Sequence, residues 1–225
     1  PDTARLEAWL ARELPGFRGP LEISQFPAGY SNLTYLLSTP GGEYVLRRPP
    51  SGTRPKSGHD MAREFQVLRA LAPAFPYCPA ALALCEDESV IGARFYVAER
   101  LRGVILRRDY PAGLEPTPKL VRAQQEALVE VLVELHRVDY AAAGLGALGR
   151  PEGYAGRQVE GWIGRFERSR TDESPEVGAL TAWLVSATPA QPLGAALLHN
   201  DYKLDNVVFD AAEPARLAGV LDWEM

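Results

Sequence analysis

The chain begins with hydrophobic residues at helical spacing. Leu6, Trp9, Leu10 and Leu14 recur every three or four positions, so they fall on one face of a helix. A Pro-Gly pair follows and ends the run. The pattern predicts an amphipathic helix over residues 2–14.

The spacing changes to that of short strands in the next part of the chain. Three short segments have the residue pattern of strands, namely LEISQF, NLTYLLST and EYVLRR. TPGG, between the last two, has the composition of a hairpin turn. Helical spacing returns in MAREFQVLRALA, and ALALCEDESVIGARFYVAERL then predicts two more strands around a turn. We therefore expect an antiparallel sheet with one inserted helix.

Beyond Gly103 the hydrophobic stripes are those of helices. Residues 118–136 carry one broad apolar stripe, which predicts a helix with a buried face. The stripe comprises Leu120, Val121, Ala127, Leu128, Val131, Leu132 and Leu135. GRQVEGWIGRFERS and SPEVGALTAWLVSA repeat the helical spacing. The prediction is an α+β fold with two lobes, a mostly stranded lobe at residues 1–102 and a mostly helical lobe at residues 103–225.

Composition and charge narrow the functions that are open to the chain. Its 225 residues are 46% hydrophobic with a net charge of −5, which favours a globular protein and disfavours a surface for nucleic acid. No window approaches eighteen apolar residues, and the N-terminal segment lacks the basic start of a signal peptide. Cys78 and Cys85 lack the cluster of further cysteines or histidines that a zinc site requires. We expect a cytoplasmic protein without nucleic-acid or membrane partners. The sequence does not indicate how many copies of the chain associate.

A dense group of polar residues interrupts an apolar run at LLHNDYKLDNVVFD. His199, Asp201, Lys203 and Asn206 have the spacing His-x-Asp-x-Lys-x-x-Asn. By themselves, an Asp and an Asn five positions apart are more often structural than catalytic, because both side chains bond readily to the backbone of turns. Asp222 ends a short apolar strand sixteen positions after Asn206, in GVLDWEM, and adds a carboxylate in a second segment.

The combination resembles the catalytic loop and the metal-binding segment of the protein-kinase-like superfamily. Asp-Trp-Glu, in place of the Asp-Phe-Gly of protein kinases, is similar to the family of aminoglycoside phosphotransferases and choline kinases. The resemblance implies that Asp201 accepts the hydroxyl proton of the phosphoryl acceptor and that Asn206 and Asp222 hold Mg²⁺. It also implies that Lys203 neutralises charge on the transferred phosphoryl group, while His199 braces the loop.

The same resemblance assigns nucleotide contacts to the first lobe. PAGYSNLTYLL is similar to the phosphate-covering loop of the family, in which Gly29 would allow close backbone approach and Ser31 and Asn32 would donate to phosphate. In the third strand, Arg47 stands where the superfamily usually has a lysine that contacts the phosphates, and Glu64 in the following helix would pair with it. Arginine can bind phosphate through two N–H groups, but it is longer than lysine and planar.

The stretch FYVAERLRG resembles the strand and hinge that lead to the second lobe. Backbone groups from Val97 through Glu99 to Arg100 would bind the edge of adenine or guanine, and Leu101 would pack on the face of the base. The resemblance thus places the hinge at about residues 97–102 and a nucleotide, ATP or GTP, beside the first lobe.

These features predict a small-molecule kinase that uses Mg²⁺ and transfers the γ-phosphoryl group of ATP or GTP to the hydroxyl of a metabolite. PAGYSNLTY, YVLRRPP and HNDYKLDNVVFD are most similar to the kinase-like domains fused to acyl-CoA dehydrogenases, which suggests a hydroxyacyl acceptor. An aminoglycoside antibiotic is the second acceptor class. A pseudokinase-like module that binds nucleotide without transferase activity is the alternative from another class, and Arg47 favours it. Members of the family continue past the position of Met225 with further helices, so we expect the helical lobe to be truncated at its C-terminal end.

Overall fold

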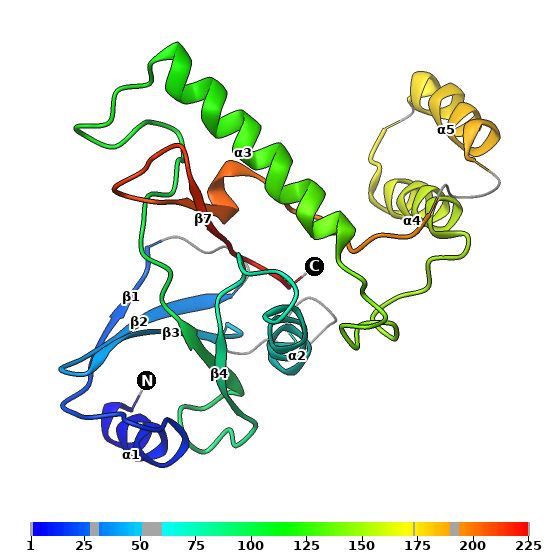
Figure 1. Ribbon diagram of the computed structural model, residues 1–225. Helices are drawn as coiled ribbons and strands as arrows, with labels where there is room; N and C mark the ends of the chain where they lie inside the picture. Colours follow the sequence, from blue (N-terminus) through cyan, green and yellow to red (C-terminus); the bar gives the residue numbers. More distant parts are fainter. Residues whose placement is uncertain (1, 28–31, 51–59, 173, 190–193, 225) are drawn as a thin grey trace. The chain divides into compact units, whose positions relative to one another are not determined.

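Figure 1 shows the computed structural model of the chain, which describes residues 2–27, 32–50, 60–172, 174–189 and 194–224. The chain divides into two compact units. The first unit comprises Pro1–Asp139 together with Leu197–Met225, and the second comprises Tyr140–Ala196. All residues that the sequence assigns to the candidate site belong to the first unit.

The first unit contains a five-stranded antiparallel sheet with the strand order β1-β2-β3-β5-β4 (Figure 1). Strand β5 is inserted between β3 and β4, so strands that are distant in the sequence become neighbours. The predicted antiparallel sheet is confirmed, and the fold belongs to the α+β class. The strands are β1 (Glu22–Gln25), β2 (Leu33–Thr39), β3 (Gly42–Arg48), β4 (Ala81–Cys85) and β5 (Phe95–Glu99).

One face of this sheet forms the hydrophobic core with helix α1 (Thr3–Glu13). Leu46 of β3 and Val97 of β5 are paired in register and are both fully buried in this core. Trp9 of α1 packs edge-to-face on Phe95, with the ring centroids 4.8 Å apart. The predicted amphipathic helix therefore exists because its apolar stripe covers the sheet.

The other face of the sheet carries the polar residues of the candidate site. Successive strand residues point to opposite faces, so Arg47 and Tyr96, which are also paired in register, face away from the α1 core. Helix α2 (Met61–Leu71) lies on this side, with Phe65 6.3 Å from Tyr96 between ring centroids. The carboxylate of Asp60 caps α2 by accepting hydrogen bonds from two main-chain N–H groups of its first turn.

The polar segment around Asp201 leads into a second, two-stranded sheet. A 3₁₀ turn at Leu204–Asn206 precedes β6 (Val207–Phe209), which pairs antiparallel with β7 (Leu217–Val220). The main chain of Val104 extends this sheet, because Val104 N–H donates to Phe209 O and Phe209 N–H donates to Val104 O, each at 2.8 Å. This sheet holds the polar segment against the residues that follow β5.

Helix α3 (Pro118–Arg137) confirms the predicted long helix. Less of its apolar stripe is buried than the spacing predicts, since Val131 and Leu135 are its only buried hydrophobic residues among those described. The third buried residue of α3 is the polar Gln124. Its Nε2 donates a hydrogen bond at 2.8 Å to the main-chain oxygen of Pro214, which lies in the β6–β7 turn. A hydrogen bond thus replaces part of the hydrophobic packing that the sequence predicts.

The second unit consists of helices α4 (Tyr154–Ser169) and α5 (Pro175–Ala187), which contact one another. Both helices lie where the sequence predicts them. Trp162 of α4 and Trp183 of α5 are 62% and 60% exposed. None of the residues described in α4 is buried, although its apolar residues have helical spacing.

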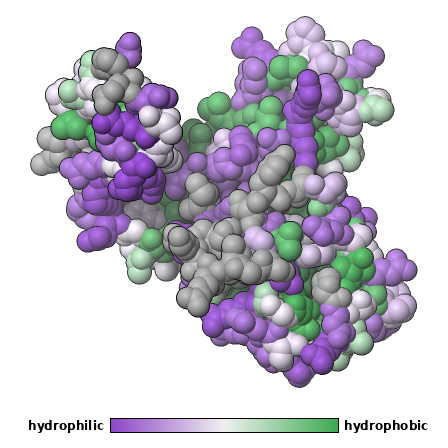
Figure 2. Space-filling view, turned by 180° about the vertical axis from the view of Figure 1, so that it is seen from behind, coloured by the Kyte–Doolittle hydropathy of each residue, from purple (hydrophilic) through white to green (hydrophobic). Residues whose placement is uncertain are grey.

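The molecular face in Figure 2 is mainly hydrophilic, and its hydrophobic residues form separate patches. In the first unit, exposed large hydrophobic residues include Val129 and Val133 of α3 and Leu204 of the 3₁₀ turn. Within the part of the chain that the structure describes, no helix combines the length and the hydropathy needed to cross a membrane.

Gly103 permits a close approach between the segment after β5 and strand β6. Its φ is +154°, and a Cβ at this position would lie 2.1 Å from Phe209 O and 2.7 Å from Val208 Cγ1. Any larger residue would therefore need both an unfavourable backbone conformation and a displacement of β6.

We predict that Gly103→Ala lowers the free energy of unfolding by about 3 kcal/mol, because steric overlap adds to backbone strain. Gly113→Ala is the matched control, since Gly113 has φ +88° but its Cβ would meet no atom within 4 Å. The control should lose only about 1 kcal/mol. Urea unfolding followed by circular dichroism measures both values, and equal losses would show that the approach to β6 is not what requires glycine.

Candidate active site

His199 is buried and fixed by two hydrogen bonds to main-chain groups. Its Nε2 lies 2.8 Å from Leu221 O, and Asp201 N–H donates to Nδ1 at 3.3 Å. A carbonyl oxygen only accepts, so Nε2 carries a proton, and Nδ1 carries none because it accepts from Asp201 N–H; the ring is therefore neutral. Burial lowers the pKa of His199, which favours the same neutral form. The imidazole therefore connects the polar loop to the segment after β7, as a bracing residue would.

Asp201 accepts hydrogen bonds from two side chains of its own loop. Lys203 Nζ lies 2.8 Å and Asn206 Nδ2 lies 2.9 Å from Asp201 Oδ2. The hydrogen bond from Lys203 is the main cause that lowers the pKa of Asp201, so this carboxyl is ionised at neutral pH. The side chain of Asp201 is 33% exposed, so the carboxylate is accessible from solvent.

Asn206 uses its amide nitrogen to hold the loop and directs its amide oxygen elsewhere. Nδ2 donates to Asp201 O at 3.0 Å as well as to the carboxylate, so Oδ1 is the atom that can coordinate a cation. The main-chain oxygen of Asn206 accepts a hydrogen bond from Leu221 N–H at 2.7 Å. Because Asp222 follows Leu221, this bond brings the segments of the two predicted metal ligands together where β6 begins and β7 ends.

Asp222 has a left-handed backbone conformation, with φ +69°, which is uncommon for residues other than glycine. Asn200, the residue before Asp201, has φ +64°. Residues in this conformation cost on the order of 1 kcal/mol or more, and they concentrate at functional sites. Two such residues beside the predicted base and the predicted metal ligand support a functional constraint on both segments.

Trp223 anchors the segment that carries Asp222. Its ring packs edge-to-face on His199 and Phe75, with centroid distances of 4.7 Å and 5.9 Å. The indole Nε1–H donates to Val220 O at 3.0 Å, and the residue is buried. This packing holds the Asp-Trp-Glu segment against the histidine that braces the polar loop.

Arg47 forms ion pairs with three carboxylates. Nη1 lies 2.6 Å from Glu64 Oε1, and Nη2 lies 2.8 Å from Asp222 Oδ1 and 3.3 Å from Glu224 Oε2. The structure therefore forms the pair of Arg47 and Glu64 that the sequence predicts, and it adds two further acids. Burial opposes the charge of Arg47, but the surrounding acids keep its pKa above the ordinary value.

Tyr96 lies on the buried side of the same cluster, opposite Arg47 in the sheet. Burial and the neighbouring Glu64 raise the pKa of Tyr96, so the phenol stays protonated. Among the described residues, Arg47 Nε and Glu64 Oε2 are buried without a hydrogen-bond partner. Buried polar atoms without a partner cost free energy, so this cluster opposes folding.

The cluster around Arg47 carries more negative than positive charge. One guanidinium faces Glu64, Asp222 and Glu224, and each of these carboxylates is less than one third exposed. In a poorly solvated site, such an excess of negative charge attracts a cation. Asn206 Oδ1 and the Asp222 carboxylate are hard oxygen donors, and Mg²⁺ commonly takes one or two protein ligands together with nucleotide phosphates. The donor set therefore fits Mg²⁺.

The structure describes only part of the predicted phosphate-covering loop. Gly29 and Ser31 lie outside the described residues. Asn32 is described and buried, and its Nδ2 donates to Glu224 Oε2. Its side-chain amide is therefore directed at an acid of the Arg47 cluster.

The predicted hinge begins inside the sheet. Val97 is fully buried in β5, where it is paired with Leu46 of β3 and Ala83 of β4. Glu99 N–H donates to Ala80 O at 2.8 Å. The sheet thus occupies the backbone at the start of the predicted hinge, and the chain leaves the sheet only after Glu99.

The residues after Glu99 are held by one acid and by strand β7. Arg100 Nη1 lies 2.5 Å from Glu43 Oε1, and Arg102 Nη2 lies 2.6 Å from Glu43 Oε2. A Cβ on Gly219 would lie 2.2 Å from Leu101 Cδ1, so the Leu101 side chain packs directly on β7. These contacts fix the connection between the five-stranded sheet and the β6–β7 sheet.

Three residues of the site are not singled out by the sequence patterns. Trp223 and Glu224 belong to the Asp-Trp-Glu segment, where only Asp222 has a predicted role. Tyr96 would follow from strand alternation, but only if β5 were known to pair with β3 in the observed register. Its position opposite Arg47 depends on that non-local pairing.

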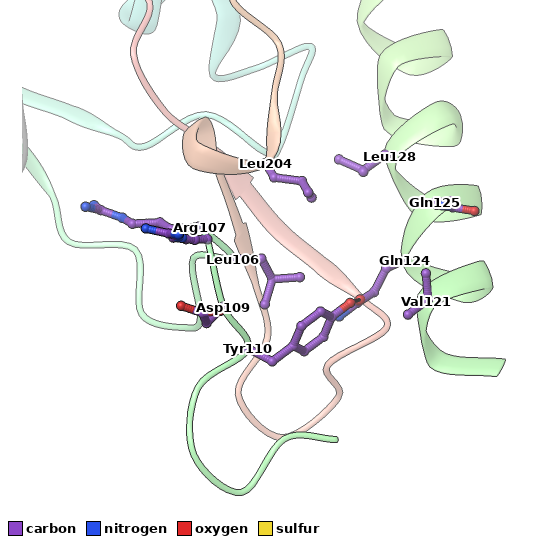
Figure 3. Close-up of a pocket in the computed structure, with 10 residues that line it drawn as sticks. Leu106, Arg107, Asp109, Tyr110, Val121, Gln124, Gln125, Leu128 and Leu204 are labelled. Carbon is purple, nitrogen blue, oxygen red and sulfur yellow. Dashed lines mark hydrogen bonds between the residues drawn. The ribbon is translucent and has the colours of Figure 1, made fainter. Parts of the chain in front are cut away.

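A cavity of about 120 Å³ lies beside α3 in the first unit (Figure 3). Leu106, Leu128 and Leu204 line it with apolar groups, while the Tyr110 hydroxyl donates to Gln124 Oε1 at 2.6 Å. The lining residues include no residue with a predicted catalytic, metal-binding or nucleotide-binding role. Leu204 itself belongs to the polar loop and follows Lys203, so the cavity borders this loop.

We predict that His199 makes the protein less stable as the pH falls below 6.5, the ordinary histidine pKa. The unfolded chain binds a proton near this pH, whereas burial delays protonation of the folded chain to a lower pH, so acidification favours unfolding. In urea titrations between pH 7 and about pH 5, His199→Gln should show a smaller loss of stability than the unsubstituted chain. His136→Gln, which removes an exposed histidine of α3, is the control. Equal pH dependence in His199→Gln and the unsubstituted chain would contradict the prediction.

Comparison with known proteins gives a family match over most of the chain. Residues 22–225 match the phosphotransferase enzyme family. Acyl-CoA dehydrogenase family member 10 of Mus musculus is 39% identical over 207 residues, which cover 92% of this chain and 19% of that protein. The chain spans between 19% and 29% of the length of the curated relatives that it matches.

Two solved structures show the same fold. A provisionally assigned aminoglycoside phosphotransferase of Ralstonia eutropha JMP134 is 39% identical, with a TM-score of 0.85 and coverage of 99% of this chain and 64% of that chain. A thermostable mutant of aminoglycoside phosphotransferase APH(4)-Ia, in a ternary complex with ADP and hygromycin B, is 17% identical. Its TM-score is 0.68, with coverage of 97% of this chain and 70% of that chain, and this likeness concerns the fold alone. The chain belongs to the phosphotransferase enzyme family and has a protein-kinase-like fold.

Proposed function

We propose that the chain is a small-molecule kinase that transfers the γ-phosphoryl group of ATP or GTP to a hydroxyl of a metabolite. The observation that carries this proposal is that the segments of Asp201, Asn206 and Asp222 are hydrogen-bonded to one another next to the β6–β7 sheet, with Arg47 bonded to the same Asp222. An ionised base, metal ligands and a phosphate-binding cation are the groups that phosphoryl transfer uses. Membership of the phosphotransferase family supports the same chemistry.

In the proposed reaction, Asp201 accepts the proton of the acceptor hydroxyl while the hydroxyl oxygen bonds to the γ-phosphorus. The bond between the γ-phosphorus and the oxygen that bridges to the β-phosphate breaks, and the nucleoside diphosphate leaves with that oxygen. The lowered pKa of Asp201 keeps its carboxylate ionised before the proton arrives. Hydrogen bonds from Lys203 and Asn206 fix its orientation. The ammonium of Lys203 is half exposed, so it can also bind the oxygens of the transferred phosphoryl group.

The nucleotide phosphates would be bound by Arg47 and by the metal ligands. Asn206 Oδ1 and the Asp222 carboxylate would hold Mg²⁺, which neutralises negative charge on the phosphates. Arg47 would bind phosphate oxygens while its ion pair with Glu64 fixes the guanidinium. Charged groups set in place before the reaction lower the barrier without reorganising during it.

The nucleotide base would be read after the sheet ends. Because Glu99 N–H is already bonded to Ala80 O, we expect main-chain groups from Arg100 to Leu101 to contact the base edge more readily than those of Val97. The half-buried Leu101 side chain would form one wall for the base. The division into lobes at residues 1–102 and 103–225, with a hinge at about 97–102, stays a prediction.

A hydroxyacyl compound is the acceptor class that we propose. Relatives with the name acyl-CoA dehydrogenase contain a segment that matches this chain in a much longer protein. A kinase segment in a protein of that name favours an acceptor that carries an acyl group. An aminoglycoside is the second acceptor class, because APH(4)-Ia, which has the same fold, was solved with hygromycin B.

A nucleotide-binding module without transferase activity is the second candidate function, and one observation favours it. Arg47 Nη2 is bonded to Asp222 Oδ1, so the guanidinium competes with a metal ion for this carboxylate. A lysine, with one compact ammonium group, would not bridge several acids in the same way. Phosphorylation of any acceptor separates the two candidate functions.

We predict that the chain phosphorylates a hydroxyacyl compound in a screen of hydroxylated acyl compounds and aminoglycosides with ATP and GTP. Asp201→Asn should lower kcat about a hundredfold or more, because the amide keeps the size of the side chain but cannot accept the proton. The nucleotide KM should change less than about twofold, since proton transfer is separate from nucleotide binding. Mass spectrometry of the phosphorylated acceptor measures the transfer.

Asp205→Asn is the matched control for this experiment, because it removes an exposed carboxylate from the same loop and should leave kcat unchanged. Full turnover by Asp201→Asn would exclude Asp201 as the base. If the unsubstituted chain binds nucleotide but phosphorylates no acceptor in the screen, the function without transfer is the correct one.

A further inference from the structure

Glu224 is the third acid of the cluster around Arg47, and the proposed phosphoryl transfer assigns it no role. It stands two residues after Asp222, and both acids contact the same nitrogen of Arg47. We infer that Glu224 is a positioning residue that draws Arg47 away from Asp222 and thereby allows Asp222 to bind Mg²⁺. This inference rests on the proposed function.

The position of Glu224 is fixed from three separate elements. Its Oε2 accepts hydrogen bonds from Asn32 Nδ2, at the start of β2, and from Arg47 Nη2 of β3 at 3.3 Å. Its main-chain oxygen accepts a hydrogen bond from Arg63 Nη1 of α2 at 3.2 Å. The side chain is only 10% exposed. Glu224 is therefore a buried and oriented acid beside Arg47 rather than a solvated one.

The geometry at Arg47 Nη2 sets up an exchange of partners. The shorter of its two contacts, 2.8 Å, is to Asp222 Oδ1, and the longer, 3.3 Å, is to Glu224 Oε2. A divalent cation on Asp222 would lie near the guanidinium, and like charges repel strongly in a poorly solvated site. A second carboxylate within reach gives Arg47 a partner when Asp222 coordinates the metal. Glu224 thus lowers the electrostatic cost of placing a cation next to Arg47.

Asn32 orients the carboxylate of Glu224. It is 3% exposed, and its amide nitrogen donates to the same Oε2 that Arg47 contacts. The sequence assigns this amide to phosphate, whereas the observed bond directs it to Glu224. In the proposed arrangement, Asn32 affects metal binding only by orienting Glu224. Substitutions of Asn32 and of Glu224 should therefore weaken the same Mg²⁺ binding step.

Thermal stabilisation of the full chain by AMP-PNP and GMP-PNP, measured over a series of free Mg²⁺ concentrations, tests this inference. Glu224→Gln keeps the size of the side chain and an oxygen for Asn32 but removes the negative charge. We expect the Mg²⁺ concentration at half-maximal stabilisation to rise about tenfold in this variant, the effect of losing roughly one charged hydrogen bond. With saturating Mg²⁺, kcat should stay within about twofold of the unsubstituted value.

Two further variants control the experiment. Glu213→Gln removes an exposed carboxylate from the β6–β7 turn and should leave the Mg²⁺ midpoint unchanged. Asn32→Ala should raise the midpoint in the same direction as Glu224→Gln. Combined with Glu224→Gln, it should add no further rise, because both substitutions act through one carboxylate.

An unchanged midpoint in Glu224→Gln, or additive effects of the two substitutions, would overturn the inference and leave the proposed function intact. If Glu224→Gln does not fold, Asn32→Ala decides by the same criterion, since an unchanged midpoint there also overturns the inference. If neither nucleotide stabilises the unsubstituted chain at any Mg²⁺ concentration, the proposed function fails and the inference fails with it.

Discussion

The guanidinium of Arg47 joins three carboxylates, and the candidate site depends on this junction. Glu64 comes from α2, whereas Asp222 and Glu224 come from the segment after β7. Strand alternation directs Arg47 to the α2 side, because its neighbour Leu46 is fully buried in the core under α1. Arg47 thereby ties the predicted metal ligand Asp222 to the sheet that would bind the nucleotide.

Burial makes this cluster costly for folding and useful for binding. Burial raises the pKa of Glu64, and Arg47 Nε and Glu64 Oε2 have no hydrogen-bond partner among the described residues. Hydrophobic residues of similar volume often stabilise a protein as well as a buried ion pair does. On the proposed function, the excess of negative charge in the cluster would instead favour a divalent cation. On the same proposal, these charges would become favourable when Mg²⁺ and nucleotide bind.

Local patterns in the sequence were sufficient to predict some features and insufficient for others. Periodicity located α1, α2 and the strands, since each pattern reflects which side of one element is buried. The resemblance to the kinase-like family singled out Asp201, Asn206 and Asp222, and the structure places their segments next to the ends of β6 and β7. Pairing of β5 with β3 is non-local, so the placement of Tyr96 beside Arg47 had no local signal. The same limit applies to Glu224, whose contacts to Asn32 and Arg47 join positions far apart in the sequence.

Calorimetric titration of ATP or GTP, with and without Mg²⁺, tests most directly whether the Arg47 cluster is a site for metal and nucleotide. In the unsubstituted chain, Mg²⁺ should increase the affinity for the nucleotide that binds by about tenfold or more, a typical coupling between two ligands. In Asp222→Asn this increase should disappear, because the variant loses the carboxylate that we propose as a ligand of the cation. The same Mg²⁺-dependent increase in Asp222→Asn and in the unsubstituted chain would contradict the assignment of Asp222 and of the cluster around Arg47.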